Sequence, residues 1–438
     1  MNTREKYQQH VNTNALKKVQ PIVIERGQGA SVWDESGREY VDLFSGISVV
    51  NTGHCHPEVV QAATAQIGRL VHTNSYLYHN RPTADFAEAL ATVMPSPPEG
   101  PGAAGTEDKA LRVSFFGNSG AEAIEGAMRL AKQYTGRTEF VALEMSFHGR
   151  TLATLSVSGN WRRKKKGGPY LPGVAFAAVP YTYRSPYGSD PETCARACAA
   201  DLERVIDLHT SGNVAAFIAE PVMGEGGIIV PPPKYFQLVK EILDSKGILF
   251  IADEVQSGFA RTGKMLAIEH YGVVPDIVVT AKGIASGFPL SAFTTREEIA
   301  KAFTPGDHLS TFGGNPVCCA AALATLGVIR KERLVEQSEA KGKKLIEKLR
   351  GLAEKHSAIG EVRGLGLMIG MELVSDRAKK TPDAGLAERV QDRMLEAGFL
   401  LGVGGTYGNV LRVQPPLVIG EEALDRAVGA MDGALGAG

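Results

Sequence analysis

The sequence predicts an α/β fold in which a mainly parallel sheet is followed by a smaller α+β domain. First, six short apolar segments between residues 111 and 281 alternate with helical segments, a pattern typical of βαβ units. Second, the chain has 438 residues, too many for one ordinary hydrophobic core. Third, the alternation stops after Pro316, where a long segment rich in Ala, Leu, Lys and Glu begins. The expected strands are 112–116, 138–143, 174–179, 214–219, 248–252 and 277–280.

Turn and helix signals predict the elements of the N-terminal part. Residues 28–43 have the pattern of a β-hairpin with a glycine-bearing turn. A loop containing glycine is expected at 44–47, and helices are expected at 57–70 and after Pro82. Residues 95–109 are rich in Pro, Gly and Ala without periodicity, which indicates a surface insertion.

The C-terminal part is predicted to form most of the smaller domain. One long helix is expected at 317–354, followed by strands at 362–373 and 410–415 with a helix between them. We expect this part to pack with the N-terminal hairpin. The predicted units are an N-terminal segment of the smaller domain, the large domain and the C-terminal part of the smaller domain, at 1–56, 57–320 and 321–438.

Composition and charge argue against several classes of protein. The formal net charge is −1, so nothing attracts the chain as a whole to nucleic acid or to anionic membranes. No stretch approaches the roughly 20 apolar residues of a membrane span, and residues 1–20 lack the apolar region of a secretory signal. The five cysteines, odd in number and without zinc-type spacing, favour free thiols in a reducing cytoplasm. A redox pair of Cys194 and Cys198 is the weaker alternative.

A turn of small residues joins the first expected strand to a helix. Ser119, Gly120 and Ala121 would let the backbone approach an anion closely, and a helix N-terminus attracts negative charge. The spacing is neither that of a P-loop nor that of a Rossmann fingerprint. Helix capping alone would also explain the turn, so its weight depends on the residues found elsewhere in the same domain.

Two reactive residues follow two apolar strands that are expected to be parallel. Asp253 closes 248–252, and Lys282 follows 277–280. In open α/β sheets, residues beyond the carboxyl ends of strands line the ligand crevice. A lysine that forms a Schiff base and an acid that pairs with a pyridine nitrogen are what pyridoxal phosphate chemistry requires. Either residue alone would be explained more simply as a helix cap or a surface side chain.

Three more residues follow expected strands. Phe147 could stack on a planar cofactor, and Arg150 could grip a carboxylate with two parallel hydrogen bonds. Glu220 ends a strand and precedes a glycine-rich loop, and it is interpreted equally well as a crevice ligand or as a structural partner.

Other motifs indicate little about function. Gly364 and Gly366 lack the third glycine of a dinucleotide motif, and no third ligand accompanies His54 and His56 to form a metal site. The five basic residues at 162–166 are expected to form a solvated loop rather than a nucleic-acid site.

Eight short motifs stand in a specific order over nearly the whole chain, at 51–54, 78–82, 118–122, 147–150, 220–221, 253–258, 281–283 and 311–316. Together they resemble the motifs of the class III, or omega-type, aminotransferases of pyridoxal phosphate fold type I. The resemblance implies a large domain with a seven-stranded, mainly parallel sheet. It also implies pyridoxal 5′-phosphate as the cofactor.

The resemblance assigns cofactor contacts residue by residue. Lys282 would hold the cofactor as a Schiff base, and Asp253 would pair with its pyridine nitrogen. Gln256 would approach the ring hydroxyl, and Val255 and Phe147 would cover the two faces of the ring. Ser119, Gly120 and Ala121 would bind the phosphate. His148, in the same motif as Phe147, is a further implied cofactor-binding residue. Thr311 would reach the phosphate from a second subunit, which implies a homodimer with its active sites at the interface.

The resemblance also implies the reaction, in which an amino donor passes its nitrogen through the cofactor to a 2-oxo acid. Glu225 and Arg412 would form a gate that frees the arginine for the alpha-carboxylate of glutamate, Arg150 would hold the other carboxylate, and Ile47 would lie near the entrance. Relatives of this kind act on 4-aminobutyrate, ornithine or alanine. A racemase or epimerase of the same family is the alternative, ahead of a non-catalytic cofactor-binding protein and a nicotinamide enzyme.

Overall fold

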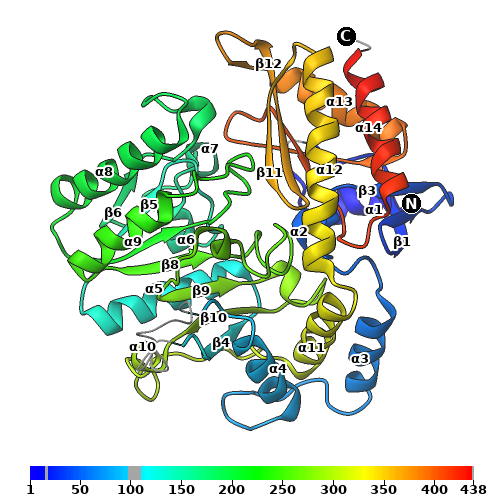
Figure 1. The fold of residues 1–438 in the computed structure, drawn as a ribbon. Helices are drawn as coiled ribbons and strands as arrows, with labels where there is room; N and C mark the ends of the chain where they lie inside the picture. The colour runs from blue at the N-terminus through cyan, green and yellow to red at the C-terminus, as the bar shows by residue number, and fades with distance from the viewer. Residues whose placement is uncertain (15–17, 97–109, 437–438) are drawn as a thin grey trace.

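The computed structural model describes residues 1–14, 18–96 and 110–436. Its centre is a seven-stranded sheet in the order β4-β10-β9-β8-β7-β5-β6 (Figure 1). The strands are β4 (Val113–Gly117), β5 (Glu139–Leu143), β6 (Val174–Ala177), β7 (Val214–Ala219), β8 (Leu249–Asp253), β9 (Ile277–Thr280) and β10 (Ser291–Thr295). Neighbouring strands are parallel except at β10, which runs antiparallel to both β9 and β4. The predicted α/β fold with a mainly parallel sheet is therefore confirmed.

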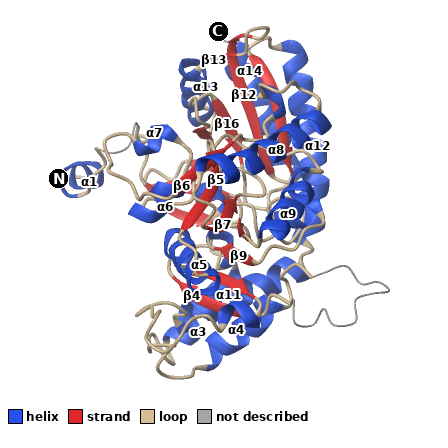
Figure 2. Ribbon diagram, turned by 90° about the vertical axis from the view of Figure 1, so that its left-hand side faces the viewer, coloured by secondary structure: helices blue, strands red, loops and turns tan. Residues whose placement is uncertain are grey.

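Alternate residues of the central strands enter two separate apolar clusters, because successive side chains of a strand point to opposite faces. Phe217 and Phe250 belong to the cluster that includes α8 (Pro191–His209) and α9 (Tyr235–Lys246). Ile218 and Ile251 belong to the cluster that includes α5 (Gly120–Thr135). Figure 2 shows the strands between α5 on one side and α9 on the other. Burial on both faces explains why these strands are continuous apolar runs in the sequence.

The six strands expected in this region are present, and the sequence analysis missed β10. Its residues are Ser-Ala-Phe-Thr-Thr, all buried, so it lacks the apolar run that marks the other strands. Phe293 is the one large apolar side chain of β10, and its ring stacks on that of Phe115 of β4 at 5.3 Å. The Thr294 hydroxyl lies 2.8 Å from that of Ser114 on the same neighbouring strand.

Two further sheets form the smaller part of the molecule. One has the order β1-β2-β3-β14 and the other the order β11-β12-β16-β15, with β13 paired to β12. These strands are β1 (Ile24–Gln28), β2 (Ser31–Asp34), β3 (Glu39–Asp42), β11 (Ile359–Leu365), β12 (Met368–Asp376), β13 (Thr381–Pro382), β14 (Phe399–Leu400), β15 (Gly402–Gly404) and β16 (Val410–Val413). The parallel pairing of β14 with β3 joins the C-terminal part to the predicted hairpin. The division at 1–56, 57–320 and 321–438 stays a prediction.

Further helices precede, connect or follow these strands. They are α1 (Thr3–His10), α3 (Pro57–Ile67), α4 (Arg81–Ala91), α6 (Leu152–Val157), α10 (Glu297–Ala300), α11 (Pro316–Lys331), α12 (Leu334–Lys355), α13 (Ala384–Glu396) and α14 (Glu421–Gly436). No helix within the described ranges is long and apolar enough to cross a membrane. Residues 97–109 of the predicted insertion lie outside the described residues.

Two predicted elements differ in the structure. The expected helix 317–354 is two helices, because Arg333 adopts a left-handed φ of 52° between α11 and α12. The expected strand 362–373 is the hairpin of β11 and β12. Gly366 lies at its turn with a φ of 51°, and Gly364 is a residue of β11 paired with Ile369, with a φ of 151°; both φ values favour glycine. The glycines that resemble a dinucleotide motif thus belong to a β-hairpin.

Candidate active site

The carboxyl ends of five strands meet at one edge of the central sheet, because β4, β5, β7, β8 and β9 all run in the same direction. Ser119 follows β4, Phe147 follows β5 and Glu220 follows β7. Asp253 is the last residue of β8, and Lys282 lies two residues beyond β9, its neighbour. The structure therefore brings the predicted acid and the predicted amine to the same edge, as expected for a ligand crevice.

Asp253 is held in a fixed orientation inside the protein. Its side chain is buried, Oδ2 lies 2.7 Å from Nδ1 of His148, and Oδ1 accepts the N–H of Val255 at 3.0 Å. The backbone N–H of His148 donates to Ser158 Oγ at 2.9 Å, which holds the backbone of His148 in place. The buried Nε2 of His148 has no hydrogen-bond partner among the described residues. One carboxylate is thus positioned by a second buried group.

Lys282 is an amine that has lost much of its hydration. It is partly buried with a left-handed φ of 50°, a conformation uncommon for a residue with a side chain and often found at functional sites. Burial lowers the pKa of Lys282 to about 8, against the opposing attraction of Asp253 and Glu220. A lysine with a lowered pKa is neutral often enough near neutral pH to act as a nucleophile.

The N-terminus of α5 offers an anion site beside these residues. Ser119 caps the helix by accepting the N–H of Glu122 at 3.3 Å. A Cβ added at Gly120 would lie 2.8 Å from Cγ1 of Val255, so only a glycine allows this close approach to the residues after Asp253. Two backbone N–H groups, of Gly120 and Ala121, belong to the first turn, where helix N–H groups have no intrahelical acceptor. Helix termini of this kind bind phosphate.

Together, these groups fit pyridoxal phosphate. Lys282 would supply an amine for the aldehyde, Asp253 a buried carboxylate for the pyridine nitrogen, and α5 an N-terminus for the phosphate. Each of these three groups lies at the end of a different strand, at the same edge of the sheet. The donor set therefore matches the cofactor that the sequence predicts.

Glu220 joins two loops of the site. Its Oε1 accepts the N–H of Phe147 at 2.9 Å, and its Oε2 accepts the N–H of Gly224 at 2.8 Å. Burial raises the pKa of Glu220, and the nearby His148 acts in the opposite direction by lowering it. The guanidinium of Arg150 lies 5.4 Å from the ring centroid of Phe147. Of the two interpretations left open for Glu220, these contacts favour the structural one.

Gln256 has a partner that the sequence analysis missed. Its Oε1 accepts a hydrogen bond from Nε2 of Gln414 at 3.0 Å, and both side chains are buried. A Cβ at Gly224 would overlap the amide of Gln256, so the loop after Glu220 packs directly on this side chain. Gln414 follows β16 in the smaller domain and is separated from Gln256 by 158 residues. No local pattern could have linked them.

The predicted pair of Glu225 and Arg412 is formed in the structure. Nη1 of Arg412 donates to Oε2 of Glu225 at 3.0 Å, and the Arg412 side chain is 5% exposed. The same guanidinium lies 5.0 Å from the ring centroid of Phe44. Burial raises the pKa of Glu225, but the charges of Arg412 and Arg163 outweigh it and leave the pKa below its usual value.

Arg163 is a second partner of Glu225 that the sequence analysis assigned to a solvated loop. It lies in α7 (Trp161–Lys164), and its Nη2 donates to Oε1 of Glu225. The loop prediction for the basic run at 162–166 is thus wrong for its first part. Lys164 also departs from that prediction, since it donates to the carbonyl of Ser156 at 3.1 Å.

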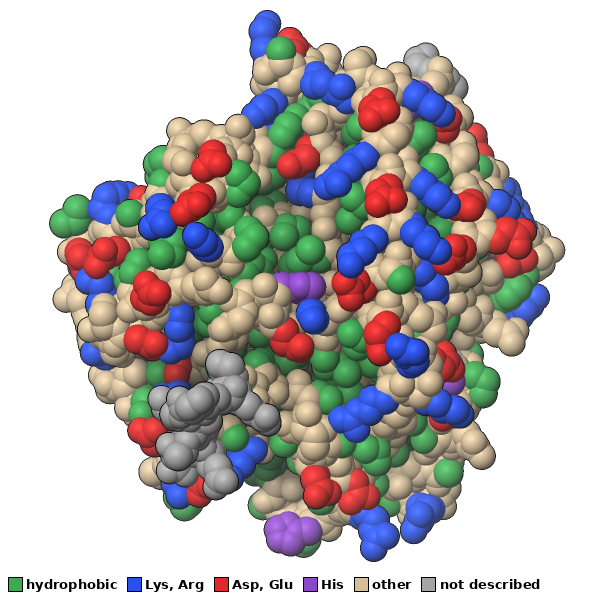
Figure 3. All heavy atoms as spheres, in the orientation of Figure 1, with side chains coloured by type: hydrophobic (Ala, Val, Ile, Leu, Met, Phe, Trp, Pro, Cys, Tyr) green, Lys and Arg blue, Asp and Glu red, His purple; other side chains and the backbone are tan. Residues whose placement is uncertain are grey.

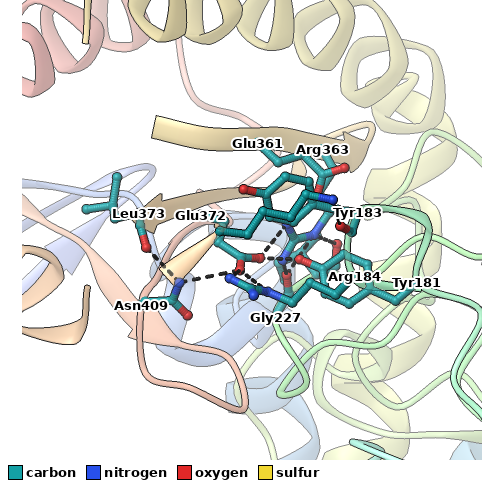
Figure 4. A network of polar contacts seen from close by, with 11 residues as sticks. Tyr181, Tyr183, Arg184, Gly227, Glu361, Arg363, Glu372, Leu373 and Asn409 are labelled. Carbon is teal, nitrogen blue, oxygen red and sulfur yellow. Dashed lines mark hydrogen bonds and ion pairs between the residues drawn. The ribbon is translucent and has the colours of Figure 1, made fainter. Parts of the chain in front are cut away.

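A buried polar network holds the loop that carries Glu225 (Figure 4). Arg363 of β11 donates through Nε to the carbonyl of Gly227 at 3.1 Å and pairs with Glu372 of β12 at 2.9 Å. Glu372 also accepts Nε of Arg184 at 2.6 Å and the hydroxyl of Tyr181. The smaller domain therefore positions both partners of the pair, because β12 is also the neighbour of β16 and Arg412.

Ile47 lies in a left-handed turn rather than an irregular loop. The turn is α2 (Ser45–Ser48), and its four residues have φ values of 46°, 62°, 70° and 58°. Ile47 is 40% exposed, and a β-branched residue with positive φ is an outlier. Ser45 anchors the turn by donating from Oγ to the carbonyl of Gln414 at 2.6 Å. The turn therefore lies beside the residues that follow Arg412.

The side chain of Thr311 is exposed in this single chain. Its neighbour Ser310 donates to Oε1 of Glu122 at 2.7 Å. The ring of Phe312, 61% exposed, lies 5.2 Å from that of His72. Thr311 thus belongs to an exposed segment that packs against α5 and residues near His72.

The other motifs have structural roles. His54 pairs with Asp42 at 2.8 Å, and His56 accepts the N–H of Glu58 at the start of α3. The described parts of the chain contain no group of three or more side chains suited to a metal ion. All five cysteines are free, and Cys194 and Cys198 are buried. Figure 3 shows acidic and basic side chains mixed over one face of the molecule, without a patch of one sign.

Comparison with known proteins agrees with this geometry. The family model described as aminotransferase class-III matches residues 13–435. The chain is 46% identical over 414 residues to alanine–glyoxylate aminotransferase 2 homolog 2, mitochondrial, of Arabidopsis thaliana, covering 94% of this chain and 82% of the relative. It is 42% identical over 426 residues to an acetylornithine aminotransferase of Methanopyrus kandleri, covering 97% and 96%. A thermostable (S)-enantioselective omega-transaminase from Thermomicrobium roseum matches with a TM-score of 0.90 and 33% identity, covering 99% and 97%. None of these relatives supports the racemase alternative.

Proposed function

The chain belongs to the class III aminotransferases, and we propose that its residues at the sheet edge carry the transfer of an amino group from an amino acid or omega-amine to a 2-oxo acid in two half-reactions. The observation that carries this assignment of roles is the position of Lys282 and Asp253 at the ends of adjacent parallel strands. Bound pyridoxal phosphate supplies an aldehyde for amines and a ring that withdraws electrons from the reacting carbon.

Lys282 acts first as the residue that holds the cofactor and then as the base. Whenever its amino group is free, Lys282 would move the proton at the substrate carbon. The pKa of about 8 supports this role, since the free amine is available near neutral pH. Asp253 keeps the pyridine nitrogen protonated, because an opposite charge favours the charged form. His148 keeps Asp253 oriented toward that nitrogen.

The other residues proposed to contact the cofactor lie at the same edge of the central sheet. Phe147 and Val255 cover the two ring faces, and Gln256 approaches the ring hydroxyl. The phosphate binds at Ser119, Gly120 and Ala121 in one subunit and at Thr311 of the other. The close packing of Val255 on Gly120 supports a cofactor that spans from the ring site to α5.

Glu225 and Arg412 set which substrates enter. Glu225 covers Arg412 when an omega-amine binds, and Arg412 becomes available when an alpha-carboxylate must be held. Their 3.0 Å contact supports the closed form of this gate. Arg150 holds the second carboxylate of a dicarboxylic substrate, and Ile47 lies at the entrance.

The working form is a cytoplasmic homodimer with its active sites at the interface. Apolar side chains near Thr311 are exposed, and contiguous apolar patches mark protein interfaces. These side chains are Leu70, Val71, Leu77, Tyr78, Leu309 and Phe312. The segments that carry them are in contact, since Asn315 donates to the carbonyl of Val71 at 3.0 Å. The free cysteines support a reducing compartment.

A donor panel tests the proposal. Alanine, N-acetylornithine, ornithine, 5-aminovalerate, 4-aminobutyrate and an aromatic amine are each paired with pyruvate, glyoxylate or 2-oxoglutarate, and the spectrum of the cofactor is followed. Rapid turnover of a donor with an omega-amino group supports the gate. Fast turnover of aromatic amines with slow 4-aminobutyrate and ornithine turnover contradicts the role given to Glu225 and Arg412.

A further inference from the structure

Glu225 lies between two arginines rather than beside one. Arg412 donates to Oε2 at 3.0 Å, and Nη2 of Arg163 donates to Oε1, the other oxygen of the same carboxylate. The exposed fractions of these side chains are 13% for Glu225, 5% for Arg412 and 39% for Arg163. The carboxylate is therefore shared by a buried cation and a cation at the surface.

The short helix α7 is built so that Arg163 can reach Glu225. Asn160 caps the helix by accepting the N–H of Arg162 at 3.2 Å, and Lys164 is anchored to the carbonyl of Ser156. The guanidinium of Arg162 lies over Trp161, with its Cζ 5.5 Å from the ring centroid. The residues on both sides of Arg163 thus have other contacts, and its pairing with Glu225 is specific to its position.

The sum of charges shows what Arg163 adds. Arg412 and Glu225 balance each other, so a substrate carboxylate that approaches them alone would bring one uncompensated negative charge into a desolvated site. A buried charge without a partner is costly. With Arg163 the three side chains carry one net positive charge, which a single carboxylate neutralises.

We propose that Arg163 is a specificity-determining residue that retains Glu225 when the carboxylate of a substrate takes its place on Arg412. Opening the gate is then a transfer of Glu225 from two arginines to one, and its carboxylate keeps a partner throughout. The substrate class that this arrangement admits is an amino acid or 2-oxo acid whose carboxylate reaches Arg412. The inference rests on the proposed function, because it concerns the same gate.

Binding of glutarate, a dicarboxylate that carries no amino or oxo group, tests the inference without turnover. Calorimetry compares the holoenzyme with Arg163→Met, Arg163→Lys and the control Arg162→Met, which changes the neighbouring residue of α7. A hydrogen bond to a charged group predicts that Arg163→Met weakens glutarate binding about ten- to hundredfold. Arg163→Lys should recover part of the loss, and Arg162→Met should stay within about twofold of the unchanged protein.

The double variant Arg163→Met/Glu225→Gln separates the charge argument from a structural role of Arg163. Removing the charge of Glu225 removes the need for a second cation, so glutarate binding should return toward that of the unchanged protein. The inference is overturned if the single and double variants lose the same affinity for glutarate. It is also overturned if Arg163→Met binds glutarate as tightly as the unchanged protein, or if the unchanged protein does not bind glutarate. Failure to transaminate any donor would instead contradict the proposed function, and the calorimetry is independent of it.

Discussion

The Nδ1 atom of His148 lies 2.7 Å from Oδ2 of Asp253, and both side chains are buried at the sheet edge. The histidine thereby restricts the carboxylate to one orientation, with its other oxygen on the N–H of Val255. A change at His148 therefore changes how Asp253 can pair with a ring nitrogen.

Replacing His148 should therefore weaken cofactor binding without abolishing it. In His148→Ala the buried Oδ2 of Asp253 loses its partner, and a loss of about tenfold or more in affinity for pyridoxal phosphate is expected. Equilibrium titration of the apoenzyme, followed by absorbance, measures it. Asp253→Asn serves as the reference and should lose more. An unchanged affinity in His148→Ala would contradict the positioning role.

Lys282→Ala should abolish transamination. The variant keeps Asp253 and the α5 N-terminus, so it should still bind the cofactor but without the absorbance of the covalent link to lysine. Lys282→Arg is the matched control, because it keeps a positive charge and lacks a nucleophilic amine near neutral pH. Both variants are measured with the best donor from the panel. Full activity in either would show that Lys282 has another role.

The lowered pKa of Lys282 predicts how fast the apoenzyme captures its cofactor at different pH values. Attack on an aldehyde requires the neutral amine, whose fraction rises tenfold per pH unit below the pKa and levels off above it. With a pKa of about 8, the capture rate should rise up to pH 8 and then become constant. Stopped-flow absorbance between pH 6.5 and 9.5 measures this profile. A rate that continues to rise through pH 9.5 would indicate a lysine that keeps its ordinary pKa.

The sequence predicted the strand ends of the site because each apolar run there is closed by a polar residue, as at Asp253. It could not predict which polar residues pair across the fold. Arg163 and Glu225 are 62 residues apart, and Gln256 and Gln414 are 158 residues apart. Such pairs depend on how the loops and the smaller domain pack, and a local pattern contains no information on this.

The break between α11 and α12 shows a second reason why the structure differs from the sequence prediction. Neither Gly nor Pro marks the break between α11 and α12, where Arg333 takes the left-handed conformation. The helices then pack on different partners, α11 against α3 and α4 and α12 against β11. Packing therefore overrides helix propensity at this point, and no local residue signals it.

Two glycines of α12 should respond oppositely to alanine. A Cβ at Gly342 would overlap the backbone carbonyl of Gly366 in the hairpin turn of β11 and β12, whereas a Cβ at Gly351 meets nothing within 4 Å. Overpacking against backbone predicts that Gly342→Ala lowers the free energy of unfolding by about 1–3 kcal/mol. Gly351→Ala should raise it by about 0.5–1 kcal/mol, because alanine favours the helix and restricts the unfolded chain. Urea denaturation of the apoenzyme compares the two variants with the unchanged chain. Similar shifts in both variants would mean that α12 is free to move away from the hairpin, and the close contact at Gly342 would then not hold the helix in place.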